Sequence, residues 1–330
     1  MENDFKTILN NAIKAGESTN NIVNSKKIIE HIQRLIRENE DIIAQANQID
    51  IKNNNGPAIS FDKISKVFKE VMENEPLVEL KEAISISDNI AYSKVYSPKG
   101  LVSIVYDGNP YALIYCSLMS ILTHNITIFT QDNYSCGLNN LLLQFVQTAL
   151  SQFGYNKNII QINYNNAAAI FDNFTTIDFT IIIGNRDFQN KHLKLCHNNV
   201  MCSGYDNYDV YIDDELHIDF IKKMLGESHN STIYLKNNLN FKIDSGIYVN
   251  DVDEAAFQIK HNGSKYCTVI FTGDNKAATE FIKGLSFSNV FVNADCFKMS
   301  LFDINQRDLL KVKTIILPSA IEPKANEKNE

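Results

Sequence analysis

Short apolar strands and apolar helices alternate through the middle of the chain, and this alternation constrains the fold more than any other feature. Helical spacing over roughly 111–123 and 139–153 separates the first three of these strands. A strand, a helix and a second strand in this order form a parallel unit. The pattern predicts an α/β fold with a doubly wound, Rossmann-type sheet, whose expected strands are 101–106, 125–130, 158–163, 179–184 and 210–213.

A second, smaller α/β unit is predicted after residue 213. Two expected helices, 252–260 and 275–285, lie among the later strands of this unit. The expected strands are 231–235, 245–250, 268–273 and 289–294.

The two ends of the chain carry different signals. Residues 20–47 and 61–72 have the apolar spacing of amphipathic helices. Residues 83–95 alternate between apolar and polar side chains, as in an extended arm or hairpin. A last strand is expected at 311–317, and the polar tail 320–330 is expected to be disordered.

Charge and composition exclude several classes of protein. The net charge of −8 argues against a general nucleic-acid binder, because phosphate contact requires a basic face. No apolar run approaches the roughly 18 residues of a membrane span, and the N-terminus lacks the apolar core of a signal peptide. The six cysteines form no CxxC pair and no disulfide framework. These features favour a cytoplasmic protein with neither nucleic-acid nor membrane partners.

Glycine is scarce. There are 13 glycines in 330 residues, about 4%, against a usual average of about 7%. Neither GxGxxG nor GxxxxGK[ST] occurs. Because glycine lets a backbone approach a phosphate closely, the composition does not favour an ordinary nucleotide site.

Three stretches resemble the aldehyde dehydrogenase superfamily, and within it the gamma-glutamyl phosphate reductases. They are SPKGLVSIVYDGNP at 97–110, VYIDDELHIDFIKKM at 210–224, and the long segment 249–294. The resemblance implies a cofactor-binding domain, a catalytic domain and a β arm that pairs subunits. It also implies hydride transfer from NADPH to an acyl group held as a thioester on cysteine, so NADP or NAD is the implied cofactor.

The segments that carry the family's chemistry depart from its pattern. The run 224–236 should contain the nucleophilic cysteine and contains none, although Ser228, His229 and Ser231 lie there. Cys202 stands where the superfamily has its general-base carboxylate. Other family positions are changed in the same way: Gly108 stands at the oxyanion asparagine, and Thr130, Gln131 and Asp132 stand at an Arg-Gly-Gly motif.

The same resemblance implies that the catalytic half of this chain is shortened, because a long segment of the family is missing between 236 and 247. The expected organisation is a cofactor-type domain that includes the arm 83–97, a truncated catalytic-type domain, an oligomerisation strand and a tail. Their expected bounds are 1–213, 214–300, 301–319 and 320–330.

Two functions remain open at this point. The first is a non-catalytic scaffold or regulatory subunit, whose vestigial cofactor residues are Asp107, Asn109, Pro110, Thr130 and Gln131. The second is an active NAD(P)-dependent oxidoreductase for an acyl phosphate or an aldehyde, with a relocated thiol such as Cys296. The retained arm and terminal strand predict a homo-oligomer, or a hetero-oligomer with a related dehydrogenase.

Other clusters have simpler interpretations. His192 and Cys196 are spaced to share a helix face near His197 and Cys202, but the spacing matches no standard zinc module, so no metal is expected. Cys267 lies in a β-branched strand and is expected to be a buried thiol. Tyr205, Tyr208 and Tyr211 are expected to share one strand face; ordinary packing is the simpler interpretation, and a ligand platform is the alternative.

Overall fold

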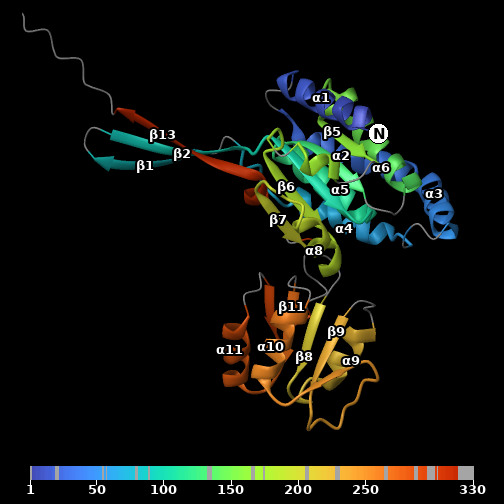
Figure 1. Cartoon of the computed structure of the whole chain (residues 1–330), viewed down its shortest axis with the longest axis vertical. Helices are drawn as coiled ribbons and strands as arrows, with labels where there is room; N and C mark the ends of the chain where they lie inside the picture. The colour runs from blue at the N-terminus through green and yellow to red at the C-terminus, as the bar shows by residue number, and fades with distance from the viewer. Residues whose placement is uncertain are drawn as a thin grey trace, which may run out of the picture. The chain divides into compact units, whose positions relative to one another are not determined.

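The computed structural model divides into two compact units (Figure 1). The first contains Met1–Thr180, Cys196–Val200 and Ile304–Glu330, and the second contains Ile181–Leu195 and Met201–Asp303. The structure describes residues 2–18, 22–53, 56, 58–78, 81–87, 90–131, 136–164, 168–173, 175–204, 208–226, 231–263, 267–285, 289–295, 302 and 304–318.

The first parallel sheet has the strand order β5-β4-β3-β6-β7. All six residues of β3 are buried, as expected for a strand with helices on both faces. The order reverses between β3 and β6, so the switch point of this sheet lies there. The strands are β3 (Leu101–Tyr106), β4 (Ile126–Gln131), β5 (Ile160–Asn163), β6 (Phe179–Ile183) and β7 (Val200–Ser203).

Helix α5 (Pro110–Leu122) is apolar on all sides and every one of its residues is buried. It contacts β4 as well as α2, α4 and α6, which explains the absence of a polar face. Helix α1 packs on β4 and β5. The remaining helical segments of the first unit are α1 (Glu2–Ser18), α2 (Ser25–Glu38), α3 (Glu40–Lys52), α4 (Phe61–Met72), α6 (Cys136–Gln152), η1 (Lys157–Ile159), α7 (Ala168–Phe171) and η3 (Gln306–Leu309). Helix α8 (Arg186–Leu193) belongs to the second unit.

The second parallel sheet has the order β10-β9-β8-β11-β12 and reverses between β8 and β11. Helices α10 (Val252–Asn262) and α11 (Asn275–Gly284) contribute Ala255, Ile259 and Phe281 to the core on one face. The opposite core includes residues of α9 (Ile218–Gly226). The strands are β8 (Tyr208–Ile212), β9 (Ser231–Lys236), β10 (Ile247–Val249), β11 (Cys267–Phe271) and β12 (Asn289–Val292).

The short connection between β9 and β10 covers part of this second face. Leu239, Phe241 and Ile243 pack against the core that contains Val210 and Phe271. An irregular segment therefore supplies apolar cover in the region where the family resemblance implied a missing stretch of chain.

Two expectations about β8 need correction. The strand begins at Tyr208 and pairs with β9 and β11, so the expected place of 210–213 among the strands of the first sheet is wrong. The expected bounds 1–213 and 214–300 stay predictions. Tyr208 and Tyr211 pack into different cores on opposite faces, because residues three apart in a strand point in opposite directions. The expected shared tyrosine face is wrong for this pair, and Tyr205 lies outside the described residues.

The expected arm is a three-stranded antiparallel sheet, β1 (Lys81–Ser87), β2 (Ile90–Pro98) and β13 (Leu310–Pro318). Every residue of β13 pairs with β2, in a register that runs from Leu310 opposite Pro98 to Pro318 opposite Ile90. Figure 1 shows these strands, teal and red, projecting from the helices and the first sheet. The tail 320–330 lies outside the described residues.

None of the helices among the described residues has the length and apolarity to cross a membrane.

Candidate functional site

The turn that follows β3 connects this strand directly to α5. Gly108 has a φ of 97°, a left-handed conformation that glycine adopts without strain. Asp107 Oδ1 accepts a hydrogen bond of 3.2 Å from the Asn109 amide. Asn109 Oδ1 accepts one of 2.9 Å from the Tyr111 amide, and Pro110 occupies the first turn of the helix. Asn109 is therefore the N-cap of α5, and its side-chain oxygen serves the local backbone.

A buried amide network lies next to this turn, at the ends of β3 and β4. Asn139 of α6 donates from Nδ2 to the Gly108 carbonyl at 2.8 Å and to Gln131 Oε1 at 3.1 Å. The Tyr106 hydroxyl donates to the same Gln131 oxygen at 3.2 Å. Gln131 is thus held inside the protein by two donors. Thr130 precedes Gln131 on β4, and its hydroxyl accepts a hydrogen bond of 3.4 Å from Asn163 at the end of β5.

The N-terminus of α6 binds a carboxylate from the same chain. Asp50, in the last turn of α3, accepts from the Leu138 amide through Oδ2 at 2.9 Å and from the Gly137 amide through Oδ1 at 3.4 Å. These amides belong to the first turn of a 17-residue helix, where the backbone carries partial positive charge. Asp50 therefore occupies an anion-binding position at this edge of the sheet.

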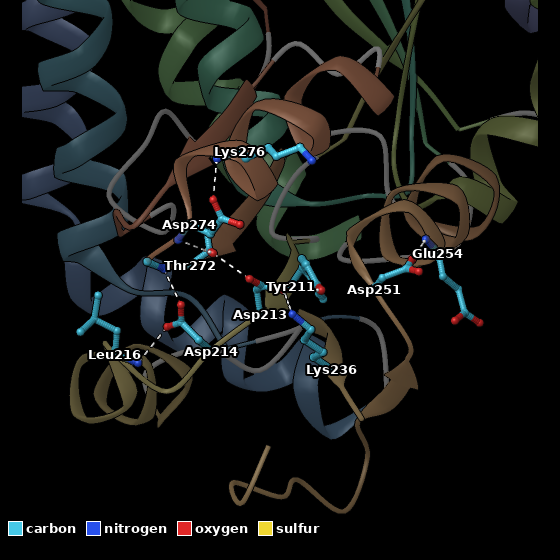
Figure 2. Close-up of polar contacts among 11 residues, drawn as sticks. Tyr211, Asp213, Asp214, Leu216, Lys236, Asp251, Glu254, Thr272, Asp274 and Lys276 are labelled. Carbon is cyan, nitrogen blue, oxygen red and sulfur yellow. Dashed lines mark hydrogen bonds and ion pairs between the residues drawn. The ribbon is translucent and has the colours of Figure 1, made fainter. Parts of the chain in front are cut away.

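A second polar cluster lies at the carboxyl edge of the second sheet, at its switch point. Figure 2 shows Asp213, Lys236 and Thr272, which follow or end β8, β9 and β11, pointing toward one another. Asp213 accepts from Lys236 Nζ at 2.9 Å, from the Thr272 hydroxyl at 2.7 Å and from the Tyr211 hydroxyl at 2.9 Å. The Asp213 side chain is 6% exposed and that of Lys236 is 35% exposed.

The ionisation of this cluster follows from its contacts. Burial alone would raise the pKa of Asp213, but the hydrogen bonds from Lys236, Thr272 and Tyr211 outweigh burial and lower that pKa. Burial and the neighbouring Asp213 charge raise the pKa of the Tyr211 hydroxyl. Asp213 is therefore a carboxylate and Tyr211 a neutral donor at neutral pH, an arrangement suited to an internal ion pair.

The backbone amides of the loop after β11 also donate to carboxylates of the same chain. Asp214 accepts from the Leu216 amide at 2.9 Å and from the Gly273 amide. Asp274 caps α11 by accepting from the Lys276 amide at 2.8 Å (Figure 2). These carboxylates serve turns and a helix end, so the contacts at this edge have structural roles.

The structure describes most of the thiols and imidazoles named from the sequence. Helix α8 ends at Leu193, so Cys196 does not share a helix face with His192 and that expectation is wrong. Cys202 is exposed on β7, and Cys267 is buried in the second sheet, as expected. Among the described residues, no group of three or more His, Cys, Asp or Glu side chains is arranged to hold a metal ion. Cys296, Ser228, His229 and Asp132 lie outside the described residues.

The sequence did not indicate that Asp50 and Asn139 take part in the first edge. It also did not indicate the contact of Asp213 with Lys236 and Thr272 at the second edge. The helix expected from 139 begins at Cys136, three residues earlier. Starting α6 at 136 would have placed Gly137 and Leu138 in its first turn and indicated that their amides need an acceptor. No sequence signal identifies Asp50 as that acceptor.

The residues at the first edge do not fit a dinucleotide phosphate bound at α6. The helix amides that would receive it already contact Asp50, and the nearby amide side chains of Asn139 and Gln131 bond to each other. The assignment of Asp107, Asn109, Pro110, Thr130 and Gln131 to a cofactor stays a prediction.

No family model matches the sequence. In sequence the chain is similar to the gamma-glutamyl phosphate reductase of Thermodesulfovibrio yellowstonii, with 21% identity over 367 aligned residues that cover 87% of both chains. It is also similar to the gamma-glutamyl phosphate reductase of Oenococcus oeni, with 25% identity over 143 residues, covering 42% of this chain and 33% of the relative.

The fold is similar to two solved structures of this superfamily. Gamma-glutamyl phosphate reductase from Thermotoga maritima superposes with a TM-score of 0.72 at 13% identity, covering 97% of this chain and 99% of that one. The glyceraldehyde-3-phosphate dehydrogenase GapN of Methanocaldococcus jannaschii, complexed with NADP, superposes with a TM-score of 0.73 at 12% identity, covering 96% and 95%. The expected resemblance is confirmed: this chain has the aldehyde dehydrogenase fold, and in sequence it is similar to gamma-glutamyl phosphate reductases.

Proposed function

We propose that this protein is a catalytically inactive scaffold or regulatory subunit built on the aldehyde dehydrogenase fold. The observation that carries the proposal is the internal occupation of the cofactor-type edge. Asn109 caps a helix, Gln131 bonds to Asn139, and Asp50 fills the N-terminus of α6. A site selected for cofactor turnover would keep these groups available to the ligand.

The sequence of the second unit supports the same proposal. The segment between α9 and β9, where the resemblance implies a nucleophilic cysteine, contains no cysteine. A thioester intermediate needs a thiol at that position, and a serine ester is a poorer hydride acceptor. The polar cluster around Asp213 does not replace that thiol, because its carboxylate, ammonium and hydroxyl groups bond to one another.

Assembly is the function that the retained parts favour. Strand β13 pairs with β2 on one side, and no described strand of this chain pairs with its other side. Val312 is 52% exposed and Ile316 is 66% exposed on this strand. An open edge with exposed apolar side chains favours pairing with another chain. The proposed assembly is a cytoplasmic homo-oligomer, or a hetero-oligomer with a related dehydrogenase.

The arm predicts a clear change in molecular mass. Ile316→Lys introduces a charge on the exposed edge strand, and we expect it to shift the purified protein toward the monomer in light scattering after gel filtration. Lys313→Ala, on the same strand, is the control and should keep the wild-type mass. A wild-type monomer at micromolar concentration would contradict assembly of this chain with itself, and co-purification with a related dehydrogenase would then test the mixed assembly.

The alternative is an active oxidoreductase that uses NAD(P) and a relocated thiol, with Cys296 as the candidate. It is supported by the neighbours solved with these cofactors, such as betaine aldehyde dehydrogenase of Staphylococcus aureus in complex with NAD+. Thermal unfolding with NAD+, NADH, NADP+ and NADPH, together with a hydride-transfer assay on aldehydes and acyl phosphates, separates the two proposals. Turnover that is lost in Cys296→Ala would establish the alternative and refute the inactive scaffold.

A further inference from the structure

The contact between Asp50 and α6 has the geometry of a bound anion. Two successive backbone amides, those of Gly137 and Leu138, point at the two oxygens of one carboxylate. Asp50 is 5% exposed, so the carboxylate is almost fully withdrawn from water. A Cβ on Gly137 would lie 3.0 Å from Asp50 Oδ1, so the glycine allows this close approach. The first turn of α6 is thus shaped around an anion.

The location in the fold is one where an anionic ligand is expected. Helix α6 follows β4, and in a doubly wound sheet ligands bind beyond the carboxyl ends of the strands. Helix N-termini at that edge receive phosphate groups through their free amides. In the same turn the Asn139 side chain is fully buried, and its Oδ1 has no hydrogen-bond partner among the described residues.

The position of Asp50 in its own helix makes the contact more informative. Asp50 lies in the last turn of α3, where the helix dipole disfavours a negative charge. Burial of a carboxylate is also unfavourable unless donors compensate it. Both costs are offset by the amides of α6, 87 and 88 residues away in the sequence. Local helix stability therefore does not account for an aspartate here, whereas the contact with α6 does.

We propose that Asp50 is an internal substitute for a phosphate, and that it excludes phosphate-bearing ligands from the N-terminus of α6. Asp50 is then a specificity-determining residue of this edge. A second anion would have to share two amides that are already used, next to a buried negative charge. A ligand that binds this edge places no phosphate on α6 while Asp50 is in place.

The inference rests on the proposed function only in treating this edge as a former cofactor site. The direct test uses inorganic phosphate and no dinucleotide. A negative result would therefore refute the role of Asp50 without refuting the inactive scaffold. Refuting the inactive scaffold would likewise leave the role of Asp50 intact.

The experiment measures the thermal midpoint of the full chain in phosphate, on the order of 10 mM, against chloride at equal ionic strength. We expect Asp50→Ala to lower the midpoint by roughly 2–4 °C, the effect of losing one helix cap in a chain of this size. Phosphate should recover at least about half of that loss, because the vacated amides bind it. Gly137 is exposed, so the solvent reaches this end of the helix.

Asp41→Ala is the matched control, since Asp41 is an exposed acid at the other end of the same helix. Wild type and Asp41→Ala should show only the small, equal shift that phosphate gives by exclusion from protein surfaces. A phosphate response in wild type as large as in Asp50→Ala overturns the proposal, as does the absence of any extra response in Asp50→Ala.

The isosteric variant Asp50→Asn covers the case in which Asp50→Ala does not fold. Hydrogen exchange at the Gly137 and Leu138 amides should be faster in Asp50→Asn than in wild type, and phosphate should slow it again. Exchange at these amides that is unchanged by the substitution, or insensitive to phosphate, also overturns the proposal.

Discussion

Replacing Lys236 by methionine tests whether the polar cluster of the second sheet stabilises the fold. Methionine keeps the length of the side chain and removes the ammonium group that lies 2.9 Å from Asp213 Oδ1. Asp213 keeps its hydrogen bonds from Thr272 and Tyr211 but loses the only cation that contacts it among the described residues. The variant therefore leaves a buried carboxylate partly compensated.

The magnitude follows from burial. Removing one partner of a fully buried ion pair costs about 3–5 kcal/mol, whereas an exposed pair contributes about 0–1 kcal/mol. The Asp213 side chain is 6% exposed, but Lys236 is 35% exposed, so water screens the wild-type pair and its loss costs less than that of a fully buried pair. Two remaining donors reduce the cost further. We expect Lys236→Met to lower the free energy of unfolding by roughly 1–2 kcal/mol at pH 7.

The pH dependence gives an independent check. The pKa of Asp213 is lowered in the folded state, so its contribution to stability is present above the unfolded pKa of about 3.9. This contribution is lost as the pH falls through the lowered folded pKa, because the carboxylate is then protonated. The difference between wild type and Lys236→Met should therefore shrink below about pH 4.

Urea unfolding followed by circular dichroism at several pH values measures both effects. Lys276→Met is the control, because Lys276 is 82% exposed and lies 3.8 Å from Glu280 in an i,i+4 pair. We expect that control to change stability by no more than about 0.5 kcal/mol. The reasoning is refuted if Lys236→Met costs no more than the control, or if its cost is the same at pH 7 and below pH 4.

Two further substitutions test the local structure. Asn109→Ala should lower stability by about 1 kcal/mol in urea unfolding because the Tyr111 amide loses its cap, and Asn109→Asp should restore most of the loss; equal stability of all three proteins would contradict the capping role. Phe281→Ala should cost about 3–5 kcal/mol in the same assay because Phe281 is fully buried and stacks on Tyr211; the exposed neighbour Ile282→Ala should cost far less, and similar losses would contradict this packing.

Much of the fold could be predicted because its signals are local. Strands such as 101–106 are continuous apolar runs between helical segments, and their period and order predict parallel sheets. The arm was predicted from alternation over 83–95, and it is a hairpin joined by β13. The assignment of strand 210–213 to the first sheet was wrong, because strand pairing rather than composition decides which sheet receives β8.

The candidate sites were predicted only in part. The turn at 107–110 was identified as a strand-to-helix connection, yet nothing in its sequence shows whether Asn109 faces a ligand or caps α5. The metal alternative at His192 and Cys196 depended on a shared helix, and the helix ends before Cys196. Periodicity indicates secondary structure but does not give the direction or the partner of a polar side chain.

The sequence by itself determined the α/β class, the presence of two α/β units, the arm and the resemblance to gamma-glutamyl phosphate reductases. Only the tertiary structure decided which polar groups bond to one another. Asp50 meets Leu138 across 88 residues, and Asp213 meets Thr272 across 59. Such contacts depend on the packing of whole helices and strands, so their partners are set by the folded core and not by neighbouring residues in the chain.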